Sequence, residues 1–213
     1  MINKLIKLVS IYKRKAKYSK VSFSFNAVDL IVDYIFKDQI QGIYIDIGSQ
    51  HPISNNNTYL LYKKGWSGTN VDLNAAAIDM FNIIRKRDNN KCALISNVNN
   101  VEKTVYYEHN FSAVNSLILT KGLKKVLKKE MTMETKTFDD LVDHEFDFLN
   151  IDLEGHDYEV LKNINLKKYV PKLICIEILE NSEDKDKIFF HMKKNAFELK
   201  KICKVSYFFE NTN

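Results

Sequence analysis

The sequence predicts an α/β fold in which helices cover both faces of a mostly parallel, twisted sheet, with an antiparallel strand pair at the C-terminus. Two short runs, 43–47 and 69–72, enclose a segment of helical character, which is the pattern of a βαβ unit. The run at 146–152 is largely apolar, as in a buried parallel strand. The last two runs, 197–203 and 205–209, are expected to form the antiparallel pair.

Helices in the first half of the chain are indicated by apolar periodicity and by end signals. One helix is expected over 27–37, where apolar residues form a single stripe. A second is expected over 58–64, with Asn56 or Asn57 as its cap and Gly65 as the left-handed residue after its end. The first of these helices would cover one face of the sheet.

The second half of the chain alternates in the same way. The signal is weakest over 110–133, where lysines from 121 to 129 surround apolar residues, so this segment is either a basic helix that covers the site or a solvated face. The remaining expected elements are a helix from 74 to 84, strands over 92–96 and 173–179, a strand or hairpin arm over 101–109, and helices over 137–141, 158–161 and 184–194.

Length and composition fit one globular domain. The chain has 213 residues, of which 45% are hydrophobic and 28% charged, so it has room for one substantial core and is too short for two full domains. An odd number of cysteines in apolar runs favours reduced thiols over a disulfide framework. No apolar run approaches the roughly 18 residues of a membrane span, and no secretory cleavage site is evident. We therefore expect a cytoplasmic protein. The cysteines are Cys92, Cys175 and Cys203.

The positive charge is concentrated at the N-terminus. The formal net charge is +5, of which residues 1–20 carry +7 and the remainder −2. The body of the protein is therefore not basic, and nucleic-acid binding is not expected. Apolar residues recur at helical spacing among the lysines of 2–19. This arm is either an amphipathic helix that lies on an anionic membrane face or an ordinary surface helix.

The first βαβ unit predicts a nucleoside site. Gly48 follows the first strand and allows close approach of the chain, and Asp72 ends the second strand 24 residues later, where an acid can bind ribose hydroxyls. A pyrophosphate site would need the pattern G-x-G-x-x-G, of which only Gly48 is present. This favours S-adenosylmethionine over a dinucleotide. A nicotinamide-dependent oxidoreductase is the alternative from the fold alone, and simple turn chemistry is the structural one.

A second polar cluster follows the strand at 146–152. Asp152, Glu154 and His156 alternate along the chain, so an extended backbone points them to one side. Carboxylates and an imidazole at a strand end suit catalysis on a hydroxyl, with His156 as the first candidate for the base. The same residues could cap the next helix or bind a hard divalent ion, whereas zinc is not expected without a second His or Cys ligand. Ser96 ends the expected third strand at the same edge, and we expect it to contact the cofactor.

Four motifs follow one another along the chain. They are His51-Pro52-x-Ser54-Asn55-x-Asn57-Thr58-Tyr59, Leu61-Tyr62-x-x-Gly65-Trp66-x-Gly68-x-Asn70-x-Asp72, Phe81-Asn82-x-x-Arg85-x-Arg87-Asp88 and Phe146-Asp147-Phe148-Leu149-x-Ile151-Asp152-x-Glu154-Gly155-His156. In this order, over about residues 40–180, they resemble the motifs of the FkbM-type methyltransferases. Ser49-Gln50 departs from the family, which often has Ala-Asn there, and Asn56 adds to its Ser-Asn-Thr pattern.

The resemblance implies a Rossmann-like class I methyltransferase fold and an enzyme that uses S-adenosylmethionine, usually to methylate oxygen. It implies that Asp46, Gly48 and Ser49 lie near the amino-acid part of the cofactor, that Asp72 binds the ribose, and that Asp152 and Glu154 flank methyl transfer beside His156. We expect residues 1–40 to form the arm and a cover helix and 41–213 the methyltransferase domain. The expected acceptor is a small molecule or saccharide, made at the inner face of the membrane. A non-catalytic nucleoside-binding protein is the alternative.

Overall fold

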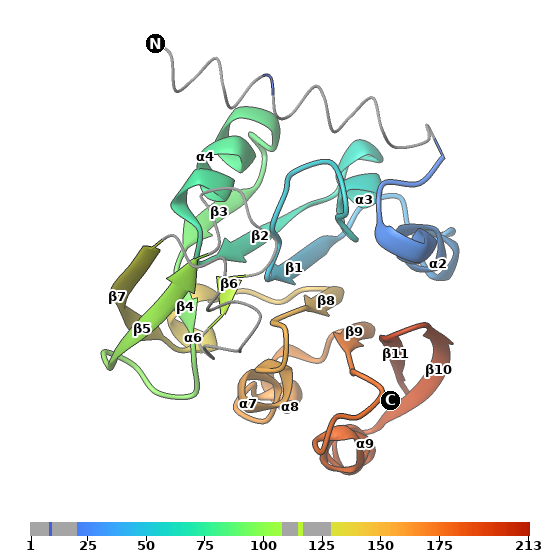
Figure 1. The fold of residues 1–213 in the computed structure, drawn as a ribbon. Helices are drawn as coiled ribbons and strands as arrows, with labels where there is room; N and C mark the ends of the chain where they lie inside the picture. Colours follow the sequence, from blue (N-terminus) through green and yellow to red (C-terminus); the bar gives the residue numbers. More distant parts are fainter. Residues whose placement is uncertain (1–8, 10–20, 108–114, 117–128) are drawn as a thin grey trace.

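The computed structural model describes residues 9, 21–107, 115–116 and 129–213, and Figure 1 shows their arrangement. The main sheet is built from the strands β1 (Ile43–Ile47), β2 (Ser67–Asp72), β3 (Asn89–Cys92), β8 (Phe148–Ile151), β9 (Leu173–Glu177), β10 (Phe197–Cys203) and β11 (Ser206–Asn211). The helices are α2 (Val28–Ile35), α3 (Tyr59–Lys63), α4 (Ala75–Ile84), α6 (Phe138–Leu141), α7 (Asp157–Leu161), α8 (Leu166–Tyr169) and α9 (Lys185–Lys194).

The main sheet has seven strands in the order β10-β11-β9-β8-β1-β2-β3. The pairs among β9, β8, β1, β2 and β3 are parallel, whereas β11 is antiparallel to both β9 and β10. The chain therefore starts in the middle of the sheet, moves to β3, and then crosses to β8 beside β1. This arrangement confirms the predicted mostly parallel sheet with an antiparallel C-terminal pair.

Helices cover both faces of this sheet, as predicted. In Figure 1, α2, α3 and α4 lie in the upper half of the molecule and α7, α8 and α9 in the lower half. One core joins α2 and α3 to Tyr44, Phe148 and Phe208 of the sheet. The other core joins α6, α7, α8 and α9 to the opposite side chains of the same strands, such as Ile45 and Leu149. Because side chains alternate along a strand, both faces of the central strands are apolar.

The local end signals that the sequence predicts are present. Gly65 has φ +104 and ends α3 in the left-handed region that glycine adopts without cost. Asn56 caps the start of α3, because its side-chain oxygen accepts the amides of Thr58 and Tyr59 at 3.0 and 2.8 Å. Asn74 caps α4 in the same manner. These short polar contacts fix where the chain turns from strand to helix.

The prediction of a third strand over 92–96 was wrong. The third strand of the main sheet is β3, which ends at Cys92, and its side chains are mostly polar because it is an edge strand. Asn90 accepts a hydrogen bond from Asn70 of the neighbouring β2, so side-chain amides replace the apolar signal expected of a strand. Leu94–Ile95 (β4) belongs to another sheet.

The pairing of that second sheet was not predicted, although its strand over Glu102–Tyr107 confirms the strand expected over 101–109 as far as the described residues reach. The sheet has the order β4-β7-β5-β6, with β5 at Glu102–Tyr107, β6 at Asn115–Ser116 and β7 at Lys129–Lys136, and its larger strands lie at the left of Figure 1. Lys129–Lys136 pairs antiparallel with β5, so the expected basic helix does not include Lys129. The helix over 2–19, the end of the 101–109 strand and the rest of the basic helix lie outside the described residues. Within the described part, no helix is long and apolar enough to cross a membrane.

Candidate active site

The loop after β1 crosses to the ends of the two neighbouring strands. The amides of Gly48 and Ser49 donate to the carbonyl of Val71 at 2.9 and 3.2 Å, which ties the loop to β2. Gly48 has φ +78, and a Cβ at this position would lie 1.8 Å from the carbonyl oxygen of Asp152. Only glycine permits this approach. The structure therefore places Gly48 beside Asp152, at the carboxyl ends of β1 and β8.

Asp72 joins the same loop to the start of α4. Its carboxylate accepts hydrogen bonds from the backbone amides of Gln50 at 2.8 Å and Asn74 at 2.7 Å. Burial raises the pKa of Asp72 to about 6, while the two amides act in the opposite direction. Each carboxylate oxygen carries two lone pairs, so both oxygens can still accept a hydroxyl. The predicted contact of Asp72 with the ribose hydroxyls stays a prediction.

Asp46 lies beneath this loop. Its side chain is buried and accepts hydrogen bonds from Thr58 at 2.7 Å, Asn150 at 2.9 Å and Asn56 at 3.1 Å. These donors come from the loop, from the start of α3 and from β8. The carboxylate therefore holds the loop against the sheet, and its predicted contact with the cofactor stays a prediction.

Sequence reasoning missed the role of Arg85, although Arg85 is part of the quoted motif. Its side chain is fully buried and donates to the carbonyl of Pro52 at 2.9 Å, to Thr58 at 2.9 Å and to Asn56. The paired acid is Asp88, whose oxygen lies 3.7 Å away. The signal in the sequence is an arginine three residues before an aspartate at the end of an apolar helix. Arg85 supports the loop through its contacts with Pro52, Asn56 and Thr58.

The loop after β8 carries the predicted acidic cluster. Glu154 and Gly155 both have positive φ, +51 and +99, so the chain is tightly turned here and the prediction of an extended backbone from Asp152 to His156 was wrong. The buried side chain of Asp157 accepts the amides of Leu153 and Gly155 at 2.8 and 3.0 Å and thereby closes the turn. Asp157 is thus the residue that caps the turn, a role that the sequence analysis had offered for Asp152 and Glu154.

The acids at this edge raise one another's pKa. Burial raises the pKa of Asp152 well above its ordinary value, and Glu177, Asp157 and Glu154 add to the shift by charge repulsion. Burial also raises the pKa of Glu154. Glu177, at the end of β9, was not among the predicted site residues. Acids that end adjacent parallel strands are the signal that could have identified it, because these ends meet at one edge.

Lys103 of the second sheet contacts Ser96, and its charge acts on His156. Lys103 of β5 donates to the hydroxyl of Ser96 at 3.1 Å. Burial lowers the pKa of His156, and the positive charge of Lys103 lowers it further. His156 is thus electrostatically coupled to the side chain that contacts Ser96. Among the described residues, no group of three or more His, Cys, Asp or Glu side chains is arranged to hold a metal ion.

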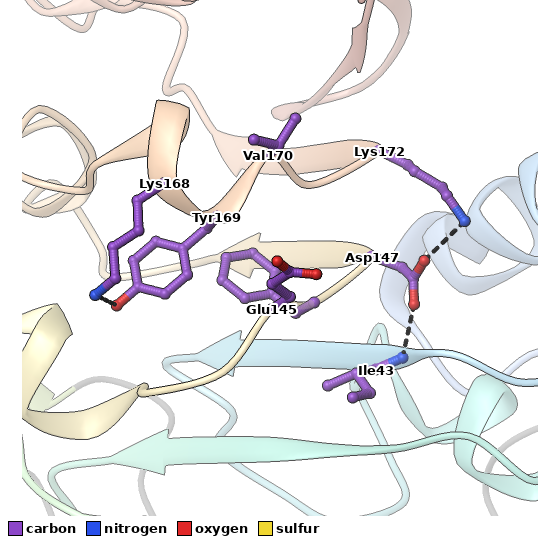
Figure 2. A pocket seen from close by; sticks show the side chains of 8 residues that line it. Ile43, Glu145, Asp147, Lys168, Tyr169, Val170 and Lys172 are labelled. Atoms are coloured by element: carbon purple, nitrogen blue, oxygen red, sulfur yellow. Dashed lines mark hydrogen bonds and ion pairs between the residues drawn. The ribbon is translucent and has the colours of Figure 1, made fainter.

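A separate pocket of about 380 Å³ opens at the amino ends of β1 and β8 (Figure 2). In this pocket Asp147 accepts the amide of Ile43 at 3.0 Å and pairs with Lys172 at 2.8 Å. Tyr169 and Val170 line it as well. Because parallel strands run in one direction, this pocket lies at the opposite edge from Gly48 and Asp152. It is not the site that the strand ends predict.

The fold is that of the class I methyltransferases. A TehB-like S-adenosylmethionine-dependent methyltransferase from Corynebacterium glutamicum has a TM-score of 0.53 and 9% identity, with 94% of each chain covered. The methyltransferase FkbM from Methylobacillus flagellatus has a TM-score of 0.52 and 10% identity, and the match covers 80% of this chain and 43% of that chain. The present chain therefore spans less than half the length of the Methylobacillus protein. At these identities the likeness shows the fold alone.

The family follows from the sequence. Residues 46–199 match the methyltransferase FkbM domain, so this chain belongs to the FkbM methyltransferase family. The cofactor of this family is S-adenosylmethionine, and the predicted resemblance and cofactor are confirmed. No curated protein is significantly similar to the chain.

Proposed function

We propose that the protein transfers a methyl group from S-adenosylmethionine to a hydroxyl of a saccharide or glycoconjugate. The observation that supports this most directly is that Gly48, Asp72 and Asp152 gather at one edge of the sheet. In sheets of this type, ligands bind outside the carboxyl ends of the strands. The family match supplies the reaction type.

The donor half of the site lies between β1 and β2. Asp72 would accept the ribose hydroxyls, while Gly48 and Ser49 would face the amino-acid part of the cofactor. When bound, S-adenosylmethionine supplies a methyl group on a positively charged sulfur. The carboxylates at this edge suit that charge, because burial makes each anion costly without a cation nearby.

The acceptor half lies between β8 and β9. Asp152, Glu154 and His156 would surround the acceptor hydroxyl. Holding that oxygen in line with the methyl group can supply roughly 7–11 kcal/mol of the barrier. A base for the hydroxyl proton adds about 10²- to 10⁴-fold. The sequence-predicted candidates for this base are His156 and Asp152.

The test is methyl transfer to defined acceptors. The purified chain is incubated with labelled S-adenosylmethionine and with a panel of methyl glycosides and host glycans, and mass spectrometry reports the mass of one added CH₂. Transfer to a glycoside hydroxyl supports the proposal. Cofactor binding with transfer only to nitrogen or carbon acceptors contradicts it, as does cofactor binding without any transfer.

We also propose that residues 1–20 contact an anionic membrane, which would place the enzyme where surface saccharides are assembled. The support is the charge of +7 over this segment and its apolar residues at helical spacing. Sedimentation with vesicles that contain anionic lipid tests the proposal on the full chain and on a chain that lacks residues 1–20. Equal sedimentation of the two chains would contradict it.

A further inference from the structure

Glu177 lies at the same level as Asp152 on the neighbouring strand. Ile151 of β8 is in register with Ile176 of β9, so the next residue on each strand is Asp152 and Glu177 respectively. On the other side of β9, Glu177 is in register with Ser206 of β11. Glu177 therefore borders the acceptor half of the proposed site from the side opposite to the cofactor strands.

One oxygen of Glu177 is held out of solvent without a partner. Its Oε2 atom is buried, and no side chain or backbone group of the described residues forms a hydrogen bond to it. A buried carboxylate oxygen that accepts no hydrogen bond costs free energy. The residue as a whole is only half-buried, so rotation of its carboxylate can turn this oxygen toward an acceptor hydroxyl, which would then donate the missing hydrogen bond.

The charges around Glu177 favour uptake of a proton. Burial is the largest cause that raises its pKa, and repulsion from Glu154 and Asp157 raises it further, to about 7. Glu177 in turn raises the pKa of Asp152. When Glu177 becomes neutral, the repulsion among these acids falls. A base whose pKa is near the working pH is also the most effective one.

The surroundings of His156 oppose the uptake of a proton. Protonation of its imidazole would create a cation near Lys103, and both this charge and burial lower the pKa of His156. Proton uptake by His156 therefore adds repulsion, whereas uptake by Glu177 removes it. Protonation of these two candidate bases therefore has opposite electrostatic effects at the same edge of the sheet.

We propose that Glu177, rather than His156, accepts the proton of the acceptor hydroxyl. The inference rests on the proposed methyl transfer to oxygen. In this step the acceptor oxygen forms a bond to the donor methyl carbon, the carbon–sulfur bond breaks with its electron pair going to sulfur, and the hydroxyl proton goes to Oε2 of Glu177. The product side then holds a neutral thioether, a methyl ether and a neutral carboxylic acid.

The experiment compares Glu177→Gln and His156→Gln with the wild-type chain. The substrates are S-adenosylmethionine and the methyl glycoside that gives the highest rate, and kcat is followed against pH. We expect Glu177→Gln to lower kcat by about 10²- to 10⁴-fold and to remove the rise of kcat with pH around neutrality. His156→Gln should lower kcat by less than about tenfold and keep the rise of kcat with pH.

Two controls separate chemistry from folding. Glu180→Gln changes an exposed acid shortly after β9 and should leave kcat unchanged. Calorimetric titration should show that Glu177→Gln binds S-adenosylmethionine with unchanged affinity, which distinguishes a lost base from a lost fold or cofactor site. An NMR titration of the side-chain carboxyl carbons, assigned by the missing signal in Glu177→Gln, measures the pKa of Glu177 without any acceptor.

The outcomes are distinct. Loss of kcat in Glu177→Gln together with a raised pKa of Glu177 supports the inference. A wild-type pH profile in Glu177→Gln, loss of the profile in His156→Gln, or an ordinary glutamate pKa for Glu177 overturns it. If the wild-type chain methylates no hydroxyl, the proposed function fails, and this is recognised from the wild type alone.

Discussion

Burial sets the protonation of the acids at the carboxyl edge of the sheet. The pKa of Asp72 and of Asp157 is raised to about 6, although each carboxylate accepts two backbone amides. The pKa of Glu177 is raised to about 7, and its Oε2 atom accepts no hydrogen bond from the described residues. Burial thus favours proton uptake by all three acids, while Asp72 and Asp157 in addition hold loops in place through the backbone amides they accept.

The raised pKa of Glu177 predicts a pH-dependent stability. The folded state binds more protons than the unfolded state between the ordinary glutamate pKa and about 7, so the contribution of Glu177 to stability is present below this window and is lost as pH rises through it. Glu177→Gln should therefore stabilise the fold more at about pH 8 than at about pH 5. Urea denaturation at both pH values measures this, with Glu180→Gln as the control. An equal effect at both pH values would contradict the prediction.

The affinity for S-adenosylmethionine should depend on Asp72 and not on His156. Asp72→Ala removes the acceptor for the ribose and the link between the loop and α4, so the Kd for S-adenosylmethionine should rise about ten- to a hundredfold. His156→Ala should leave this Kd near the wild-type value. Calorimetric titration measures both, and Asp186→Ala, an exposed change on α9, is the control. The same loss of affinity in Asp72→Ala and His156→Ala would refute this expectation.

At the scale of elements, the loop after β1 depends on one glycine. Gly48→Ala forces a Cβ against the carbonyl oxygen of Asp152 at 1.8 Å, between β1 and β8, in addition to strain at φ +78. We expect it to lower the free energy of unfolding by more than about 4 kcal/mol. Gly65→Ala is the matched control, because its φ is +104 but no atom lies within 4 Å, so only strain of about 1–2 kcal/mol remains. Chemical denaturation of both variants compares them, and equal losses would rule out the clash.

Arg85 should be equally necessary for the loop. Arg85→Met leaves the buried acid Asp88 without its cation and removes donors from Asn56 and Thr58. Loss of one partner from a buried ion pair costs about 3–5 kcal/mol. Lys86→Met changes an exposed neighbour and should stay within about 0.5 kcal/mol of the wild type. A loss below about 1 kcal/mol for Arg85→Met would show that the network is dispensable.

Elements were predictable where their signals are local. The apolar runs of β1, β8 and β9, the caps Asn56 and Asn74 and the turn at Gly65 all depend on a few neighbouring residues, and all were found. The edge strand β3 and the pairing of the second sheet were missed because strand pairing is set by distant partners. Strands β5 and β7 pair across 20 residues or more of chain that carry little pattern. Helix α8 has only four residues, too few for periodicity.

At the scale of the whole molecule, the sheet order accounts for the site. Placing β1 between β2 and β8 brings Gly48 to Asp152 and Asp72 to Gln50, although these residues are far apart in the sequence. The sequence predicted that such an edge exists, because acids follow three apolar runs. Which acids face a ligand and which are occupied within the protein depends on packing. For this reason the carboxylates of Asp46 and Asp157 accept hydrogen bonds from within the protein, whereas Oε2 of Glu177 accepts none from the described residues.

Cofactor binding should stabilise the fold, because a ligand that binds the folded chain and not the unfolded one shifts the equilibrium toward the folded state. At a concentration of about 100 times Kd, S-adenosylmethionine adds about 2.7 kcal/mol, which for a chain of this length raises Tm by about 5–11 °C. Differential scanning fluorimetry measures the shift. Asp72→Ala at the same concentration should show a smaller shift. NAD should produce none, because the glycines that a pyrophosphate needs are missing. A shift with NAD that equals the one with S-adenosylmethionine would mean that this edge binds dinucleotides, contrary to the proposed use of the site.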